Sequence, residues 1–478
     1  MTLWTTKEIS EALKNELQHS INSFENLLIE NVFIDSRKKI FAGLFIALKG
    51  ENTDGHKYLT QAFENGANYA IVEQIPDEIK NTNLVSQLIL VKNTYKALDK
   101  LAEFSRKRTK AKIIALTGSV GKTGTKEMLK SVFSTQGKTF ANSGNLNNHI
   151  GLPLSLSNLE ADCEYAIFEM GMNHLNEIVH LSKIARPHVA IITNVGPVHI
   201  EFFKNEQEIA LAKSEIFAGL VENGLAILNA DNIHFEFLKQ QAKSYGIKES
   251  NLFSFGNKNQ ADYQINEILI TESSLSKIEA KLKNSQKISY HTGCSNQAVN
   301  FNSIIVVACL DLIGNDLNSG LAILKNFSSS DGRGKVSEII VNDKKITIID
   351  DTYNASILSM KAGLQNCEKL KNILCKKRMI CALGDMLELG EKSFEIHCEV
   401  LSFLKEKNFD KIILVGSQME EANQYIKLNN CKNYIDSTSA SQEFAEILND
   451  GDIVYLKGSR GMKMEKIIEK LTLKTSVH

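Results

Sequence analysis

An apolar run that leads into a glycine-rich turn and Lys-Thr constrains this chain more than any other feature. Ile113–Leu116 is apolar, and the residues after it read Thr-Gly-Ser-Val-Gly-Lys-Thr. The apolar residues of Met128–Phe133 then recur at helical spacing. A strand, a glycine-rich loop and a helix in this order form a phosphate cradle. Backbone N–H groups surround the phosphates, the lysine neutralises them, and the threonine hydroxyl reaches Mg²⁺. The segment therefore predicts a phosphate site formed by Thr117, Gly118, Ser119, Val120, Gly121, Lys122 and Thr123.

This loop is a variant of the general pattern. The general pattern has a glycine five positions before Gly121, and this chain has Leu116 there. The alternative is an ordinary glycine-rich turn in which Lys122 is only solvated. The flanking strand and helix favour the phosphate site.

Composition excludes several classes of protein. The 478 residues are 43% hydrophobic and 23% charged with a net charge of −1, which is typical of a globular protein and gives no basic surplus for nucleic acid. The longest apolar run, Ile304–Leu310, is far shorter than the roughly 20 residues that span a bilayer. The start of the chain lacks the pattern of a signal peptide. We therefore expect a cytoplasmic protein with no membrane span. The eight cysteines form no Cys-x-x-Cys pair and indicate reduced thiols.

The chain is expected to be α/β, in three parts. Residues 1–108 predict a small α/β domain, with a helix near Leu59–Asn65 and a strand at Tyr69–Val72. Residues 109–328 alternate strands and helices, which predicts a mostly parallel sheet that contains the phosphate loop. Residues 329–478 repeat this alternation and predict a Rossmann-like doubly wound domain. The other expected strands are Ile113–Leu116, Tyr165–Phe168, Val189–Thr193, Leu225–Leu228, Ile346–Ile349, Met379–Leu383, Lys411–Val415 and Ile453–Leu456.

Polar residues after these strands are candidate site residues, because ligands bind beyond the carboxyl ends of parallel strands. A carboxylate placed like Glu169 commonly holds Mg²⁺, although an exposed glutamate fits equally well. His199 is an unusual partner for Mg²⁺, which prefers oxygen. Lys213, taken alone, is a surface lysine on a helix.

Two polar segments of the third part also lie directly after predicted strands. Asp350–Ala355 reads Asp-Asp-Thr-Tyr-Asn-Ala, which suits ribose hydroxyls, a metal-bound phosphate or a base edge, or else an Asx turn. Lys457–Arg460 reads Lys-Gly-Ser-Arg ahead of a helix expected near Met462. It suits an anion pocket, and a simple helix cap is the alternative.

Taken together, these segments resemble the Mur ligase family over essentially the whole chain. The blocks stand in the family's order: Asp35–Arg37 with Gly43–Gly50 and Asp54–His56, then Thr117–Thr123, Asn145–Leu154, Glu169–His174, Val198–Glu201, Asp350–Ala355, Leu383–Gly390 and Lys457–Arg460. The chain departs from the family at Ala298, where a histidine is frequent. It also departs at Ser356–Ile357, where the family has Asn-Pro.

The resemblance implies a role for each block. It implies ATP contacts by the phosphate loop and by Asn302, Arg333, Asp351 and Asn354. It implies contacts to a UDP-linked substrate by Ser36, Arg37, Asn52 and Asp54. It implies Mg²⁺ ligation by Thr123, Glu169, His199 and, as a carbamate, Lys213, with Lys122, Glu169, His199 and Lys213 as the catalytic set. For the acceptor or peptide it suggests Asn148, Asp385, Lys457 and Arg460, with His397 as a further candidate.

The implied activity is ATP-driven amide synthesis through an acyl phosphate. The substrates implied by the last blocks are UDP-N-acetylmuramoyl-tripeptide and D-alanyl-D-alanine, handled by a monomer. Three alternatives stay open. One is a sibling ligase that adds an amino acid to another UDP-muramoyl peptide or glutamate to folate. The others are a P-loop ATPase that forms no bond and an inactive nucleotide-binding regulator.

Overall fold

The computed structural model describes residues 2–18, 28–198, 200–258, 260–272 and 275–473. The chain forms two compact units. The first comprises residues 1–116, 137–191 and 215–225, and the second comprises residues 117–136, 192–214 and 226–478. Within the described residues, none of the helices combines the length and the apolar character needed to cross a bilayer.

A four-stranded parallel sheet lies near the N-terminus, with strand order β1-β2-β3-β4. Its strands are β1 (Asn31–Phe33), β2 (Gly43–Ile46), β3 (Ala67–Val72) and β4 (Leu88–Leu90). The helices of this region are α1 (Thr6–Leu13), α2 (Leu59–Glu64) and α3 (Thr94–Arg108). All four strands run in the same direction, so the segments that follow them start from one edge of the sheet.

Apolar side chains cover both faces of this sheet. On one face Leu44 and Ile71 join a buried cluster with residues of α1, α3 and α5 (Gly151–Ser157). On the other face Phe45 and Ala70 pack with residues of α2. Trp4 is fully buried, and its indole N–H donates to the Ser157 carbonyl over 2.9 Å.

The second sheet has nine strands in the order β13-β12-β11-β10-β9-β8-β5-β7-β6. Strand β7 pairs in parallel with β5 and β6, and β10 pairs in parallel with β9 and β11, whereas β11, β12 and β13 form an antiparallel meander. The strands are β5 (Lys112–Thr117), β6 (Thr139–Ala141), β7 (Tyr165–Glu169), β8 (Val189–Ile192), β9 (Leu225–Asn229), β10 (Leu252–Gly256), β11 (Tyr263–Glu272), β12 (Leu275–Lys281) and β13 (Lys287–Thr292). The helices of this region are α4 (Lys122–Phe133), α5, α6 (Glu177–Ala185), α7 (Glu206–Ser214), α8 (Phe235–Ser244), α9 (Gln297–Ile313) and α10 (Leu317–Leu324).

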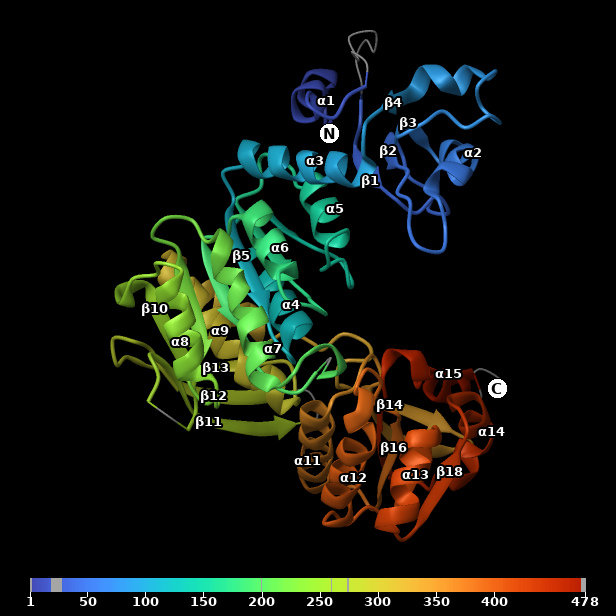
Figure 1. The fold of residues 1–478 in the computed structure, drawn as a ribbon. Coiled ribbons are helices and arrows are strands. Elements are labelled where there is room, and N and C mark those ends of the chain that lie inside the picture. Colours follow the sequence, from blue (N-terminus) through green and yellow to red (C-terminus); the bar gives the residue numbers. More distant parts are fainter. Residues whose placement is uncertain (1, 19–27, 199, 259, 273–274, 474–478) are drawn as a thin grey trace. The chain divides into compact units, whose positions relative to one another are not determined.

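The third sheet has six strands in the order β14-β15-β19-β16-β17-β18, and only the β14–β15 pair is antiparallel. Its strands are β14 (Lys335–Val341), β15 (Lys344–Asp351), β16 (Met379–Gly384), β17 (Lys411–Val415), β18 (Cys431–Tyr434) and β19 (Ile453–Lys457). Helices lie on both of its faces (Figure 1): α11 (Ile357–Ile373), α12 (Ser393–Lys405), α13 (Ser417–Ile426), α14 (Ser437–Ile447) and α15 (Glu465–Leu473). This is a doubly wound arrangement, in which the strand order places β19 between β15 and β16.

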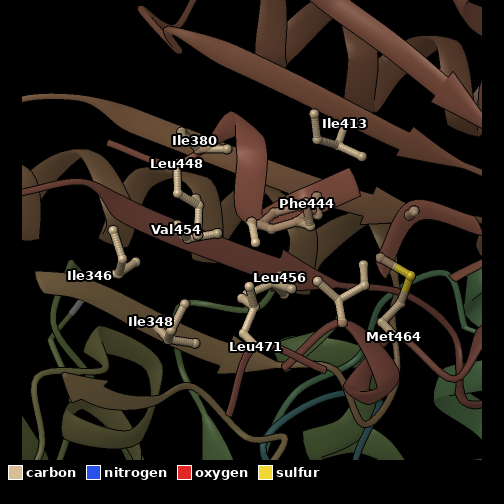
Figure 2. Close-up of a cluster of buried hydrophobic side chains, with 14 of the residues drawn as sticks. Ile346, Ile348, Ile380, Ile413, Phe444, Leu448, Val454, Leu456, Met464 and Leu471 are labelled. Carbon is tan, nitrogen blue, oxygen red and sulfur yellow. The ribbon is translucent and has the colours of Figure 1, made fainter. Parts of the chain in front are cut away.

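The core of the third sheet follows the alternation of its strands. Figure 2 shows Ile346, Ile348, Val454 and Leu456 on one face, packed with Phe444 and other residues of α14 and α15. Helix α11 contacts β16 and β19. Parallel strands covered on both faces are continuously apolar, as in Ile453–Leu456.

The α/β fold class predicted from the sequence is confirmed. Each of the predicted strands is present, and none of their ends differs from the observed end by more than two residues. One prediction was wrong in detail: Arg460–Met462 forms a single 3₁₀ turn, and α15 begins at Glu465 instead of near Met462. The domain boundaries near residues 108 and 328 stay predictions.

Candidate active site

The phosphate loop has the backbone geometry of an anion cradle. Gly118 has φ 155° and Gly121 has φ 84°, and Gly121 caps the N-terminus of α4. The Ser119 amide donates to the Asn194 carbonyl over 2.8 Å, and the Ser119 hydroxyl donates to the Gly196 carbonyl over 2.8 Å. The loop is therefore held against the segment that follows β8, and the first amides of a twelve-residue helix point out of its end.

Asn302 and Thr193 lie directly against the two glycines of the loop. A Cβ at Gly121 would lie 2.2 Å from Asn302 Nδ2, and a Cβ at Gly118 would lie 2.0 Å from Thr193 Oγ1. Thr193 also donates its hydroxyl to the Val120 carbonyl over 2.7 Å. Both positions favour glycine, because their positive φ strains a residue with a Cβ and the added atom would also lie against Thr193 or Asn302.

Taken alone, the helical pattern predicted a surface lysine at position 213. In the structure Lys213 lies in the last turn of α7 and is buried, with 3% of its surface exposed. Burial, and secondarily the charge of Lys122, lowers its pKa well below the usual value for lysine. A neutral amine at this place is chemically able to act as a nucleophile toward CO₂.

Glu169 is the last residue of β7 and is almost fully buried. It pairs in register with Leu116, the residue that precedes the phosphate loop. Asn147 donates from Nδ2 to Glu169 Oε1 over 2.8 Å, and Asn142 bonds both the amide and the carbonyl of Glu169. The carboxylate is therefore held in a fixed orientation at the carboxyl end of the strand.

Three of the four expected Mg²⁺ ligands, Thr123, Glu169 and Lys213, are among the described residues. His199 lies outside the described residues. Among the residues that are described, no group of three or more histidine, cysteine, aspartate or glutamate side chains is arranged to hold a metal ion. The Mg²⁺ ligands expected from the sequence stay predictions. The hydroxyl of Thr123 and the carboxylate of Glu169 are oxygen donors, which are of the type that Mg²⁺ prefers.

Asp351 and Lys457 end the neighbouring strands β15 and β19 and form an ion pair in which Lys457 is buried and Asp351 is half-buried. Lys457 Nζ lies 2.7 Å from Asp351 Oδ2, and the Tyr455 hydroxyl donates to the same oxygen over 3.1 Å. Burial raises the pKa of Asp351, against the opposing effect of the lysine. Both groups are thus fixed at the carboxyl edge of the third sheet, where doubly wound sheets bind ligands.

Two arginines approach one aromatic ring beside this pair. The Arg333 guanidinium carbon lies 3.8 Å from the centre of the Tyr353 ring, and that of Arg460 lies 5.4 Å from it. Arg460 also pairs with Glu465 at 3.0 Å. Asn354 is exposed, and its side-chain oxygen accepts the Ala355 amide. The structure thus brings Arg333 and Arg460 together.

Asp385 and His397 are engaged in contacts that shape the fold. The Asp385 carboxylate accepts the amides of Gln418 and Met419 over 3.2 and 2.8 Å, at the start of α13. The His397 ring accepts the Met386 amide at Nε2 over 3.0 Å, so its proton is on Nδ1, which lies 2.7 Å from the Ser393 carbonyl. Burial lowers the pKa of His397.

The residues expected to bind a UDP-linked substrate follow β1 and β2. Ser36 donates to Gln61 over 2.7 Å, and the exposed Arg37 forms a bidentate pair with Asp35 at 2.8 and 2.9 Å. Asn52 is exposed on the loop after β2, and Asp54 ends that loop. Asn148, suggested for the acceptor, accepts the amides of Ile150 and Gly151 at the start of α5.

Comparisons with known proteins agree with this arrangement of motifs. The family model for the Mur ligase middle domain matches residues 116–310, and the model for the Mur ligase glutamate ligase domain matches residues 337–460. A Rickettsia prowazekii protein named UDP-N-acetylmuramoyl-tripeptide--D-alanyl-D-alanine ligase is 33% identical over 98% of this chain and 99% of its own length. The chain belongs to the Mur ligase family.

Solved Mur ligase structures share the whole architecture. A crystal structure of MurF from Acinetobacter baumannii superposes with a TM-score of 0.84 and 29% identity, over 98% of this chain and 99% of that one. MurF from Thermotoga maritima, solved in complex with ADP, gives a TM-score of 0.78 and 26% identity, over 95% and 99% of the two chains.

Sequence reasoning missed several residues that support the site of this Mur ligase. Asn142 and Asn147 hold Glu169, Thr193 holds the phosphate loop, and Tyr455 holds Asp351. Asn142 and Thr193 follow β6 and β8 directly in the structure, but the sequence predicted no strand at β6 and extended the strand of β8 to Thr193, so neither residue was recognised as following a strand. Tyr455 lies inside an apolar strand, and its sequence gives no comparable signal.

Proposed function

We propose that this Mur ligase joins D-alanyl-D-alanine to UDP-N-acetylmuramoyl-tripeptide, with ATP converted to ADP and phosphate. One observation carries the proposal: a relative named for this reaction matches the chain over 98% of its length at 33% identity. The tripeptide carboxylate attacks the γ-phosphorus of ATP, which forms an acyl phosphate and releases ADP. The dipeptide amine then attacks the acyl carbon and expels phosphate.

The second unit supplies the groups for phosphoryl transfer. The loop amides and Lys122 bind the β- and γ-phosphates, and Lys122 stabilises the charge that develops on the γ-phosphoryl oxygens. Asn302 lies at the rim of the loop, next to Gly121, and contacts the base in this proposal. Arg333, Asp351 and Asn354 complete the nucleotide contacts from the third sheet. Catalysis then rests on positioning and electrostatics, without a covalent protein intermediate.

Mg²⁺, when bound, neutralises phosphate charge and orients the γ-phosphoryl group. In this proposal Thr123, Glu169 and His199 ligate it, together with Lys213 as a carbamate. The depressed pKa of the Lys213 amine supports the last assignment, because a carbamate forms only on the neutral amine.

The first unit is proposed to bind the UDP moiety through Ser36, Arg37, Asn52 and Asp54. Lys457 and Arg460 suit the carboxylate of the acceptor dipeptide, because both are cationic. Asp385 and Asn148 keep their acceptor assignments as predictions, although their side-chain oxygens already accept backbone amides. We further propose that the protein acts as a cytoplasmic monomer.

Acceptor-dependent phosphate release tests the function. Protein, Mg²⁺ and ATP are mixed with UDP-N-acetylmuramoyl-tripeptide, with and without D-alanyl-D-alanine, and the products are weighed by mass spectrometry. Phosphate that requires both substrates, with the mass of the UDP-linked pentapeptide, is the expected result. Phosphate release without either substrate would indicate an ATPase instead. Turnover with a free amino acid but not with the dipeptide would indicate a sibling ligase.

A further inference from the structure

The carboxyl edge of the four-stranded sheet holds a chain of hydrogen bonds that the proposed reaction does not use. The loop after β2 ends at Asp54, Glu73 follows β3, and Thr94 begins α3 after β4. Because the strands are parallel, these segments leave the sheet at one edge. Asp54 is among the residues proposed to bind the UDP moiety, and His56 links it to the other two segments.

His56 bonds two of these segments at once. Its side chain is only 5% exposed, and Nδ1 lies 2.6 Å from Asp54 Oδ1. The backbone amide of Glu73 donates to Nε2 over 2.9 Å. An amide N–H can only donate, so Nε2 accepts and the proton of the neutral ring is on Nδ1. His56 therefore donates a hydrogen bond to the carboxylate of Asp54.

The far end of this chain is anchored in α3. The Glu73 carboxylate accepts the Thr94 amide over 2.8 Å and the Thr94 hydroxyl over 3.1 Å. The imidazole is fixed between Asp54 and the Glu73 amide at the end of β3, and it cannot turn without losing a bond. Asp54 accepts a second bond from the His56 amide over 3.0 Å.

Asp54 keeps an accessible face although it is held on one side. Its side chain is 23% exposed, and the hydrogen bonds from the His56 amide and imidazole both fall on Oδ1. Burial works against ionisation, but the amide and imidazole of His56 hold the pKa of Asp54 below its usual value. The carboxylate is therefore charged and oriented, and a ligand can still approach it.

We propose that His56 is a positioning residue for the UDP substrate: it orients the Asp54 carboxylate to accept a hydrogen bond from the uridine nucleotide. This inference rests on the proposed function. Each nitrogen of the His56 ring has its own task. The Nδ1 donor orients Asp54 and governs substrate affinity, whereas the Nε2 acceptor ties the loop to β3 and governs stability.

Two substitutions separate these tasks. In His56→Gln the side-chain amide reaches the place of Nε2, so the bond to Glu73 is kept and the donor to Asp54 is lost. In His56→Asn the amide nitrogen lies near the place of Nδ1, so the donor is kept. Thr94→Val is the matched control, because it removes a hydroxyl from the same chain of bonds without touching Asp54.

The dissociation constant of UDP-N-acetylmuramoyl-tripeptide is measured by calorimetry for the full-length protein and each variant, together with thermal unfolding. We expect about tenfold weaker binding in His56→Gln, as for a lost hydrogen bond to a charged group. We expect binding within about threefold of wild type in His56→Asn and Thr94→Val. The ATP KM stays unchanged throughout. Nitrogen-15 spectra of the wild-type ring report the Nδ1–H tautomer.

A double-mutant cycle with Asp54→Asn gives a second readout. If His56 acts through Asp54, His56→Gln adds no further loss of affinity in the Asp54→Asn background. Additive losses, or wild-type affinity in His56→Gln, would overturn the positioning role. Equal losses in His56→Gln, His56→Asn and Thr94→Val would also overturn it, since they report a general structural defect. A wild-type protein that does not bind the UDP substrate would instead overturn the proposed function on which this inference rests.

Discussion

Lys122 Nζ donates a hydrogen bond to the carbonyl of Gly118 over 2.6 Å, so the phosphate loop is closed by its own lysine. The ammonium thus lies within the ring of amides that would surround a phosphate. A bound γ-phosphate offers a charged acceptor in place of a neutral carbonyl, which makes the exchange of partners favourable.

Lys122→Ala is expected to lower the rate of acceptor-dependent phosphate release by about 10²- to 10³-fold, as for other losses of a charge-stabilising donor. Lys130→Ala, at an exposed position on the same helix, should release phosphate at the wild-type rate. A wild-type rate in Lys122→Ala would remove the loop lysine from the mechanism.

Gly121→Ala should weaken ATP binding strongly. The added Cβ would lie 2.2 Å from Asn302 Nδ2 at a φ of 84°, which by itself costs about 1–2 kcal/mol for a residue with a Cβ. Gly124→Ala is the matched control, since its Cβ would meet only Val299 at 3.7 Å. The ATP dissociation constants of Gly121→Ala and Gly124→Ala are measured and compared. Equal values would contradict the close contact of Gly121 with Asn302.

Lys213 should take up CO₂ as a carbamate. Burial lowers its pKa well below the usual value for lysine, which raises the fraction of the neutral amine that can react. A carbamate signal in carbon-13 spectra with labelled bicarbonate is expected in the wild type and in Lys243→Ala, which changes an exposed lysine of α8. The signal should be absent in Lys213→Ala. Full activity of Lys213→Ala would contradict a role for the carbamate.

Asn147→Ala should raise the Mg²⁺ concentration needed for half-maximal activity by about tenfold, because partners that orient a metal ligand commonly have effects of this size. Asn147 donates to Glu169 Oε1 over 2.8 Å. Asn158→Ala provides the comparison, since the Asn158 side chain bonds the Val32 amide and carbonyl in β1. Its Mg²⁺ dependence should match the wild type, although its stability falls. An unchanged Mg²⁺ dependence in Asn147→Ala would argue against Glu169 as a ligand.

His188 should make stability depend on pH. Its Nδ1 accepts the Ile113 amide over 2.9 Å, and burial together with three nearby cationic side chains lowers its pKa to about 4. The unfolded chain binds this proton near pH 6.5, so the stabilisation is complete above pH 6.5 and is lost as the pH falls toward 4. Solvent screening at a half-buried ring reduces the loss to the order of 1–2 kcal/mol.

Urea unfolding at pH 7 and pH 4.5 measures this loss. His188→Asn keeps an acceptor for the Ile113 amide and removes the titration, so it should lose less stability over this range than the wild type. Identical losses would assign the pH dependence to other groups.

The parallel strands that the sequence predicted are continuously apolar because they are buried on both faces, as in Met379–Leu383 and Ile453–Leu456. Short parallel strands that are less buried, such as β6 and β18, were missed. The meander β11–β13 was missed, since its strands alternate polar and apolar residues and contain many charges. The phosphate loop is local in sequence and was therefore visible. The burial of Lys213 could not be predicted, because it depends on the tertiary packing around α7.

The partners of the site residues were hidden for the same reason. His397 and Met386 lie eleven residues apart, and Asn147 and Glu169 lie twenty-two apart. A hydrogen bond over such a separation exists only once the intervening helix or strand is folded. The sequence therefore identified the candidate site residues but not partners such as Asn147 and Tyr455 that orient them.

Asp385 ties three separate segments together. It follows β16, its carboxylate caps α13, and its carbonyl accepts the Ser459 amide over 3.0 Å in the segment that contains Lys457 and Arg460. Displacing one of these segments would strain the other two, so the surface that they form is rigid before any ligand arrives. A molecule that binds there loses its own conformational freedom, but the protein surface is already ordered. A rigid surface of this kind discriminates by shape among acceptors of similar charge.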